Sequence, residues 1–170
     1  MSTANATAFV YVTFIRTSPD KLWAAITSPE FMKEYWFGMH IRTDWKAGSS
    51  WQLLFPDGRV ADCGAIVEID PPKRLVLKWQ NEWKPEMKAE GYSHLTMELE
   101  ALDGAVKLSI HHVMDRAESK FIQAVSGGWP SILSNLKSLL ETGEVVLKTY
   151  AKNIDQVEAT RAGDRSQTVS

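Results

Sequence analysis

One stretch, from Ser119 to Glu141, constrains the fold more than any other, because its apolar residues repeat at helical spacing along its whole length. They fall on one stripe of the helix: Phe121, Val125, Trp129, Ile132, Leu133, Leu136 and Leu140. A helix with so broad an apolar face needs a surface that covers it. The chain before it reads mainly as strands and turns, so we expect this helix to pack on a sheet.

The middle of this helix contains Gly127, Gly128 and Pro130, with Trp129 next to the proline. Proline has no amide hydrogen and crowds the preceding turn, so we expect a kink or a break here. The two glycines would let another backbone or a ligand come close. This is therefore a place where the helix could make room for a ligand or clamp the Trp129 ring.

The sequence before this helix predicts one strand, two short helices and six further strands. Residues 9–16 are β-branched or aromatic almost throughout, as in a strand that is covered on both faces or lies near the sheet centre. Ser18-Pro19 and Ser28-Pro29 each supply a capping hydroxyl followed by a proline, which is a start signal for a helix. Between Met39 and Met114, alternating segments separated by turns indicate an antiparallel meander with one apolar face.

The composition argues against several kinds of partner. Its 19 basic and 21 acidic residues give a formal charge of -2, which is no electrostatic footprint for nucleic acid or a membrane surface. The single cysteine, Cys63, excludes an internal disulfide, and the first residues lack an export signal. No apolar run approaches the roughly 20 residues that span a bilayer. We therefore expect a cytoplasmic protein.

The length of 170 residues suits one domain with a core, and we expect that domain to cover residues 1–143. Residues 144–170 carry one short apolar patch and then turn polar. We expect this tail to dock through the patch and to be disordered beyond it. The patch consists of Val145, Val146, Leu147 and Tyr150.

Seven tryptophans make an aromatic-lined cavity the main candidate site. Trp51, Phe55 and Trp79 lie in the apolar phases of neighbouring strands, and Trp129 would face them from the helix. Trp36 would cover the cavity mouth, and Trp83 could act as a lid. The alternative is that these rings fill the interior completely. The predicted cavity residues are Trp36, Trp51, Phe55, Trp79, Met97, His112, Phe121, Trp129 and Leu133.

Among the polar candidates, His112 falls in the apolar phase of its strand and would point toward the cavity; the alternative is a hydrogen-bonded wall residue. His111 would point the opposite way, so the pair cannot chelate one metal, and we expect no metal site and no catalytic group set. Arg59, Asp62 and Glu68 alternate along one strand and could supply a buried charge to the cavity, but a charge on the solvent face of the sheet is the commoner explanation. Cys63 matches no nucleophile spacing.

The order of these elements resembles the helix-grip fold of START domains, the allergen Bet v 1 and polyketide cyclases, the SRPBCC superfamily. Within that superfamily, residues 9–143 resemble the branch named after the activator of Hsp90 ATPase (AHSA1-like). The motifs that carry the resemblance are Ser18-Pro19, Leu22 to Thr27, Pro29-Glu30-Phe31, Tyr35-Trp36, Gly48 to Trp51, Gly64 to Pro72, Arg74 to Trp79 and Gly128-Trp129-Pro130.

The resemblance implies an α+β fold in which a curved antiparallel sheet of six to seven strands wraps around a long C-terminal helix, with two short helices after the first strand. It also implies a cavity between that helix and the sheet, often used for small apolar molecules. It implies no shared reaction, because the cavity binds in some members and catalyses in others. Hsp90 activation does not follow from the resemblance alone.

Three functional hypotheses follow. The first, which we favour, is non-catalytic binding of a small, mostly apolar molecule, oriented by polar groups such as His112, Tyr35 and Tyr92. The second is a cyclase, dehydratase or hydrolase that uses His112 as general base. The third is an Hsp90-activator-like interaction module. The partners considered are therefore a small apolar molecule, a second copy of the chain and a chaperone; no cofactor, nucleic acid or membrane is expected.

Overall fold

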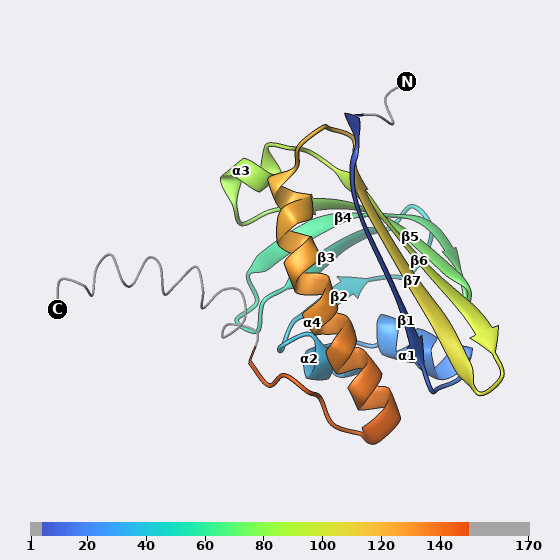
Figure 1. Ribbon diagram of the computed structural model, residues 1–170. Helices are drawn as coiled ribbons and strands as arrows, with labels where there is room; N and C mark the ends of the chain where they lie inside the picture. Colours follow the sequence, from blue (N-terminus) through green and yellow to red (C-terminus); the bar gives the residue numbers. More distant parts are fainter. Residues whose placement is uncertain (1–4, 150–170) are drawn as a thin grey trace, which may run out of the picture.

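The computed structural model describes residues 5–149 (Figure 1). The elements follow in the order β1 (Thr7–Ile15), α1 (Pro19–Thr27), α2 (Pro29–Tyr35), β2 (His40–Thr43), β3 (Ser50–Leu54), β4 (Val60–Asp70), β5 (Arg74–Asn81), α3 (Pro85–Lys88), β6 (Ser93–Leu102), β7 (Ala105–Met114) and α4 (Lys120–Thr142).

The described strands form one antiparallel sheet of seven strands in the order β1-β7-β6-β5-β4-β3-β2. Each strand after β2 pairs with the one before it in the chain, as in a meander, and β1 closes against β7. The sheet curves around α4, and α1 and α2 lie at one end of it (Figure 1). The predicted α+β helix-grip fold, with its long helix packed on a sheet and two short helices after the first strand, is confirmed.

The two short helices begin as the sequence predicts. Ser18 Oγ accepts a hydrogen bond from Lys21 N (3.2 Å), and Ser28 Oγ accepts one from Phe31 N (3.5 Å). Each hydroxyl thereby satisfies one of the free amides of a helix N-terminus. A third short helix, α3, lies between β5 and β6.

The first strand is not at the sheet centre, and that prediction is wrong. Among the described strands β1 pairs with β7 alone, so it is an edge strand. Its outward side chains are uncovered: Val10 is 60% exposed, Val12 43% and Phe14 52%. A run of β-branched and aromatic residues favours a strand but does not reveal how many of its faces are covered.

The long helix α4 runs without interruption from Lys120 to Thr142, so the alternative of a break at Pro130 is wrong, whereas a kink there stays a prediction. Proline removes the hydrogen bond that its own amide would donate and crowds the preceding turn, but these local costs do not end a helix that is held by packing. The stripe of buried side chains on either side of Pro130 holds the helix against the sheet, and such packing supplies most of a helix's stability in a protein. Ser119 caps the start through Ile122 N (3.0 Å), and Gly143 ends the helix.

The chain after α4 is tied back to it by Asn135, a fully buried residue on the helix. Asn135 Oδ1 accepts from Leu147 N (2.7 Å), and its Nδ2 donates to Leu147 O (2.8 Å). Val145 packs against the core, whereas Val146 is exposed. The rest of the predicted tail, residues 150–170, lies outside the described residues.

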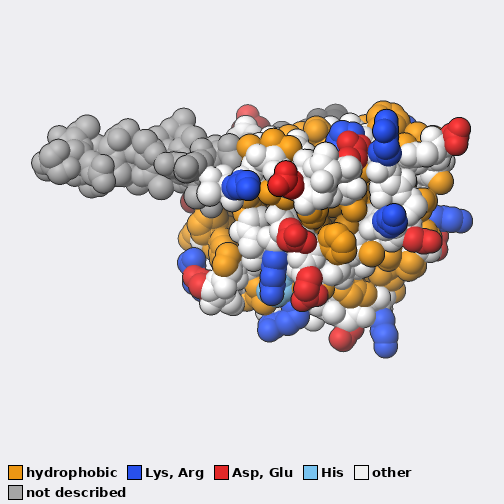
Figure 2. All heavy atoms as spheres, turned by 90° about the horizontal axis from the view of Figure 1, so that it is seen from below, with side chains coloured by type: hydrophobic (Ala, Val, Ile, Leu, Met, Phe, Trp, Pro, Cys, Tyr) orange, Lys and Arg blue, Asp and Glu red, His pale blue; other side chains and the backbone are white. Residues whose placement is uncertain are grey.

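Charges of both signs are interspersed on the face drawn in Figure 2, without a large patch of one sign. This distribution agrees with the near-equal numbers of basic and acidic residues in the sequence. That face therefore has no broad cationic surface. Within residues 5–149, no helix is long and apolar enough to cross a membrane.

Gly64 lies between Trp51 on β3 and Trp79 on β5 in the strand register, at a place where a side chain would not fit. A Cβ at this position would lie 1.7 Å from the carbonyl oxygen of Lys78. Trp51 Nε1 donates to that same oxygen (3.1 Å). The missing side chain therefore lets Trp51 reach across β4, and its ring packs against Trp79 with 4.6 Å between centroids.

We expect Gly64→Ala to destabilise the fold by about 3 kcal/mol or more, because β5 would have to move away from β4. Gly58→Ala is the matched control: no atom lies within 4 Å of the added methyl group, although its φ of +93° makes a cost of about 1 kcal/mol reasonable. Denaturant unfolding measures both variants. Equal losses would contradict the special role of Gly64.

Candidate functional site

A cavity of about 120 Å³ lies between α4, α2 and the concave face of the sheet. Aromatic and aliphatic side chains form most of its wall, and a few polar groups gather at one end. The lining residues are Trp36, Met39, Leu53, Phe55, Ala61, Asp62, Trp79, Asn81, Trp83, Lys84, Met87, Phe121, Ala124, Val125, Gly128, Trp129 and Ile132. The interior is therefore not completely filled by its rings.

Five of the nine predicted cavity residues lie on this wall: Trp36, Phe55, Trp79, Phe121 and Trp129. The other four are buried in the surrounding core and do not line it: Trp51, Met97, His112 and Leu133. Tyr35 and Tyr92 also lie off the wall. Ligand binding by any of these residues stays a prediction.

The tryptophan rings converge at the centre of the molecule. The Trp129 ring lies 5.6 Å from that of Trp36 and 5.9 Å from that of Trp79. Trp51 supports Trp79 from behind. Tilted and edge-on contacts of this kind are favourable beyond the area that they bury. The four rings thus form one interlocked cluster, of which three members face the cavity.

His112 belongs to a buried hydrogen-bond chain rather than to the cavity wall. Trp129 Nε1 donates to His112 Nδ1 (3.2 Å), so the ring proton lies on Nε2. That nitrogen donates to Ser93 Oγ (2.8 Å). Ser93 Oγ in turn donates to the backbone oxygen of Trp79 (3.3 Å). The chain connects α4 to three strands and engages both nitrogens of the imidazole.

The imidazole stays neutral across the physiological range. Burial is the main cause that lowers the pKa of His112 to about 3, and the nearby His111 and His94 contribute to this shift. A group that is already hydrogen-bonded at both nitrogens and resists protonation is a poor general base. His112 therefore fits the alternative of a hydrogen-bonded residue, placed behind the cavity wall, and ligand contact or general-base catalysis by it stays a prediction.

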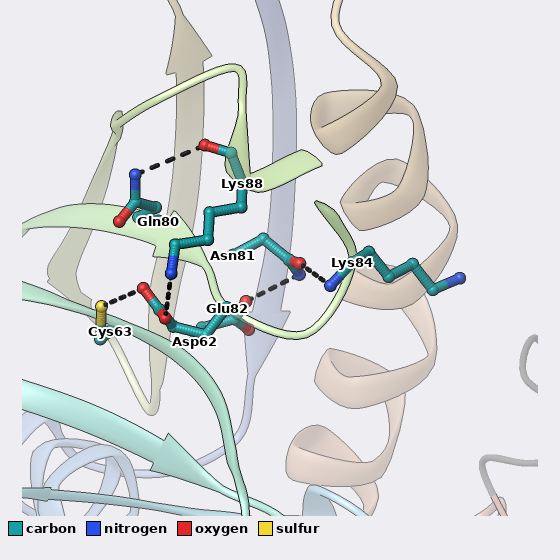
Figure 3. A network of polar contacts seen from close by, with 7 residues as sticks. All are labelled: Asp62, Cys63, Gln80, Asn81, Glu82, Lys84 and Lys88. Atoms are coloured by element: carbon teal, nitrogen blue, oxygen red, sulfur yellow. Dashed lines mark hydrogen bonds and ion pairs between the residues drawn. The ribbon is translucent and has the colours of Figure 1, made fainter. Parts of the chain in front are cut away.

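The polar end of the cavity is built by Asp62 on β4 and Asn81 on β5 (Figure 3). These residues are partners in the strand register, and Asn81 Nδ2 donates to Asp62 Oδ1 (2.9 Å). Asn81 Oδ1 accepts from Lys84 N (2.8 Å), which fixes the start of the loop that carries α3. Asp62 is buried, so our placement of this carboxylate on the solvent face is wrong.

The pKa of Asp62 is raised to about 7, mainly by burial and to a smaller extent by the nearby Glu82 carboxylate. The side chains of Trp79 and Asn81 stabilise the ionised form of Asp62, so they act in the opposite direction and lower its pKa. A carboxyl group in such surroundings can gain or lose a proton near neutral pH. It is the one buried carboxyl group among the described lining residues.

Trp79 also carries an unpartnered donor. Its Nε1–H is buried and makes no hydrogen bond of good geometry among the described residues, although it lies close enough to Asp62 to lower the pKa of that carboxyl group; the side chain is only 2% exposed. Leaving a buried donor unpaired costs free energy, typically about 1–3 kcal/mol. Because Trp79 lines the cavity, this donor is a candidate contact for a bound molecule.

The neighbouring Cys63 is not a second reactive group. Its thiol donates to Glu82 Oε2 (3.0 Å), and Glu82 Oε1 pairs with Lys88 Nζ (2.9 Å; Figure 3). Burial and the Glu82 hydrogen bond raise the pKa of Cys63 to about 12. A thiol that keeps its proton at neutral pH is not a nucleophile.

The rim of the cavity belongs to the α3 loop (residues 82–92). Its Trp83 ring packs edge-on against Phe55, with 5.4 Å between centroids, and remains exposed to solvent. Glu90 ties the far end of the loop to α4, because its carboxylate accepts from Ser119 Oγ (2.6 Å) and Lys120 N (2.7 Å). A carboxylate at a helix N-terminus also interacts favourably with the helix dipole.

Sequence reasoning missed the polar end of the site. The register of β3 against β4 shifts between Leu53 and Leu54, and within β4 both Ala61 and Asp62 are buried side by side. Such an irregularity breaks the simple alternation on which a strand phase is assigned. The one signal in the sequence was Asn81, a turn-forming residue at the end of an apolar strand.

We expect Asp62→Asn to change how stability depends on pH. Because the folded-state pKa of Asp62 is raised from 3.8 to about 7, the folded protein holds this proton more tightly than the unfolded chain. The resulting stability is present below about pH 4 and is lost as pH rises through about 7. The asparagine variant lacks this loss. Its free energy of unfolding, relative to that of the wild type, should therefore rise by roughly 2–4 kcal/mol between about pH 4 and about pH 7.

Urea unfolding of both proteins across that range measures the difference. Asparagine keeps an oxygen that can accept from Asn81 Nδ2, so the pair itself is preserved. A difference in stability that does not change with pH would contradict the buried, proton-holding state of Asp62.

The fold is shared with several solved structures. Protein MLL2253 from Mesorhizobium loti superposes with a TM-score of 0.69 at 20% identity, covering 82% of this chain and 100% of that chain. Aha1 from Colwellia psychrerythraea, solved as a dimer, gives 0.65 at 18% identity, with 81% and 98% covered. PFC0360w, an HSP90 activator from Plasmodium falciparum, gives 0.64 at 23% identity, with 78% and 95% covered. These likenesses show the fold.

A comparison with curated protein sequences found no match. A family-level comparison did: residues 16–141 match the family described as Activator of Hsp90 ATPase homolog 1-like protein. The match runs from the end of β1 to the last turn of α4 and so includes the cavity and the buried chain behind it. The chain therefore belongs to the Activator of Hsp90 ATPase homolog 1-like family.

Proposed function

We propose that this protein binds a small, mostly apolar molecule in the cavity between α4 and the sheet, without catalysing a reaction on it. The observation that carries the proposal is the incomplete filling of the interior, where about 120 Å³ stays open among large aromatic rings. Protein cores pack to nearly the density of organic crystals, so an interior that served only for packing would be expected to close this space.

The volume supports a ligand of about one ring. An engineered apolar cavity of about 150 Å³ holds benzene, whereas pockets for drug-sized molecules measure about 300–1,000 Å³. The exposed Trp83 and the half-buried Phe55 stand at the rim, so part of a longer molecule could extend past them. The apolar wall would supply most of the binding free energy.

The lining residues support binding over catalysis. Among the described residues of the wall there is no serine, threonine, cysteine, tyrosine or histidine to act as nucleophile beside Asp62. The other ionisable side chain on the described wall is Lys84 at the rim. His112, the base that an enzymatic function would use, is engaged at both nitrogens.

The paired glycines of α4 test this proposal. Gly128 is buried and lines the cavity, whereas the adjacent Gly127 is exposed. We expect Gly128→Leu to fill the cavity and weaken binding of p-xylene, a one-ring probe, by at least about tenfold, since a buried leucine occupies much of a ring's volume. Gly127→Leu makes the same change on the other side of the helix and should bind as the wild type does.

Isothermal titration calorimetry measures the affinity, and thermal unfolding checks that each variant is folded. Ala124→Leu, one turn earlier on the wall, provides a second cavity-filling variant. If neither cavity-filling variant differed from Gly127→Leu, or if the wild type bound none of a panel of one-ring probes, the proposal would be refuted.

A second candidate function, contact with another copy of this chain, is favoured by the outer face of β1. Val10, Val12 and Phe14 follow one another on that face and are all exposed. A contiguous apolar patch on a surface marks a contact site. The strand edge itself is partly covered, because Lys137 Nζ donates to the carbonyl oxygen of Phe14. The face of β1 is therefore the better surface for self-association.

We expect Val12→Lys to weaken self-association, because a charge would be buried in the contact. Val146→Lys, at a valine after α4 that is even more exposed, is the control and should have no effect. Sedimentation equilibrium over a series of concentrations measures both. A wild-type protein that is monomeric at every concentration would exclude this candidate.

A further inference from the structure

The polar end of the cavity holds two hydrogen-bonding groups that the protein itself does not fully use. Trp79 and Asn81 lie two residues apart on β5 and line the cavity, and Asp62 faces Asn81 across the strand pair. The Asn81 amide is occupied on both sides, by one Asp62 oxygen and by Lys84 N. The Trp79 Nε1–H lies near the Asp62 carboxyl group and influences its pKa, but the two do not meet in good hydrogen-bond geometry. Both groups therefore keep capacity for a ligand atom that would lie between them.

These two groups differ in what they require from a ligand. The indole N–H can only donate, so it needs an acceptor. An ionised carboxylate can only accept, so it needs a donor. A hydroxyl group supplies both from a single oxygen atom. A carbonyl supplies an acceptor alone, and a hydrocarbon supplies neither.

A ligand with its own negative charge fits this end poorly. Its carboxylate would lie beside buried Asp62, and two carboxylates sharing one dry site repel each other. The cation on the wall, Lys84, belongs to the rim and not to the strand pair that carries Trp79 and Asp62. The recognised molecule should therefore be uncharged.

We propose that the cavity takes a small aromatic or alicyclic molecule that carries an uncharged hydroxyl group. The hydroxyl oxygen accepts from Trp79 Nε1, its proton is donated to Asp62, and the ring lies among Trp36, Trp129 and Phe121. This assignment rests on the proposed binding function and adds the class of ligand to it. The hydrogen bonds supply orientation and specificity, while the ring supplies the apolar contact.

A pair of nearly isosteric probes tests the assignment. p-Cresol and p-xylene differ by a hydroxyl in place of a methyl group, and 4-methylbenzoate adds the charged alternative. p-Xylene is the more hydrophobic of the first two, so a purely apolar cavity would prefer it. We expect the wild type to bind p-cresol about tenfold more tightly than p-xylene, and Trp79→Phe to reverse that order, because the variant keeps a ring but loses the donor.

Nuclear magnetic resonance of the indole N–H groups gives a readout on the wild type that does not depend on the variant's folding. The Trp79 signal should move to lower field with p-cresol and much less with p-xylene, as a new hydrogen bond requires. The other six indole signals serve as internal references.

The outcomes separate the two proposals. If none of the three probes binds, the binding function fails and the ligand class fails with it. If p-xylene binds as tightly as p-cresol, or if the Trp79 signal responds alike to both, the cavity binds apolar molecules but the hydroxyl assignment is overturned. A water molecule that already accepts from Trp79 Nε1 would give this result. If 4-methylbenzoate bound most tightly of the three, the hydroxyl assignment would be overturned, and Lys84 at the rim would be the group that binds the ligand.

Discussion

The position of α4 depends on one buried hydrogen-bond chain, which runs from Trp129 through His112 and Ser93 to the backbone of Trp79. Burying three polar side chains is costly unless each finds a partner, and here each does. Because these bonds are directional, they fix the helix in one orientation on the sheet, which apolar contacts alone would leave less well defined. The low pKa of His112 keeps its Nδ1 free to accept from Trp129.

The cavity follows from this arrangement. Trp129 is held against the sheet while the neighbouring Gly128 contributes no side chain, so space remains on one side of the helix. Trp79 is fixed from two directions, by the ring of Trp51 and by that of His112, whose centroid lies 5.5 Å away. A wall that is already rigid loses little conformational entropy when a molecule binds against it. The same rigidity holds the Trp79 N–H beside Asp62.

Much of this could be predicted from periodicity, because helix and strand phases report which side chains face a common interior. The stripe on α4 and the alternation in β3 and β5 brought Trp51, Trp79 and Trp129 together correctly. Asp62 was missed because a register shift placed two consecutive residues inside, and a carboxylate is a rare occupant of such a position. The edge position of β1 depends on the order of strands, which local pattern does not encode.

The anchoring of the α3 loop bears on how fast a molecule can come and go. Asn81 holds one end of the loop to the sheet, and Glu90 holds the other to the start of α4. Opening the loop as a unit would break both anchors, whereas the exposed Trp83 can change rotamer without disturbing either. Rotamer changes of exposed side chains take picoseconds to nanoseconds, far less than loop opening. A molecule bound as proposed would therefore exchange past the Trp83 side chain, and the contacts inside the cavity would set its residence time.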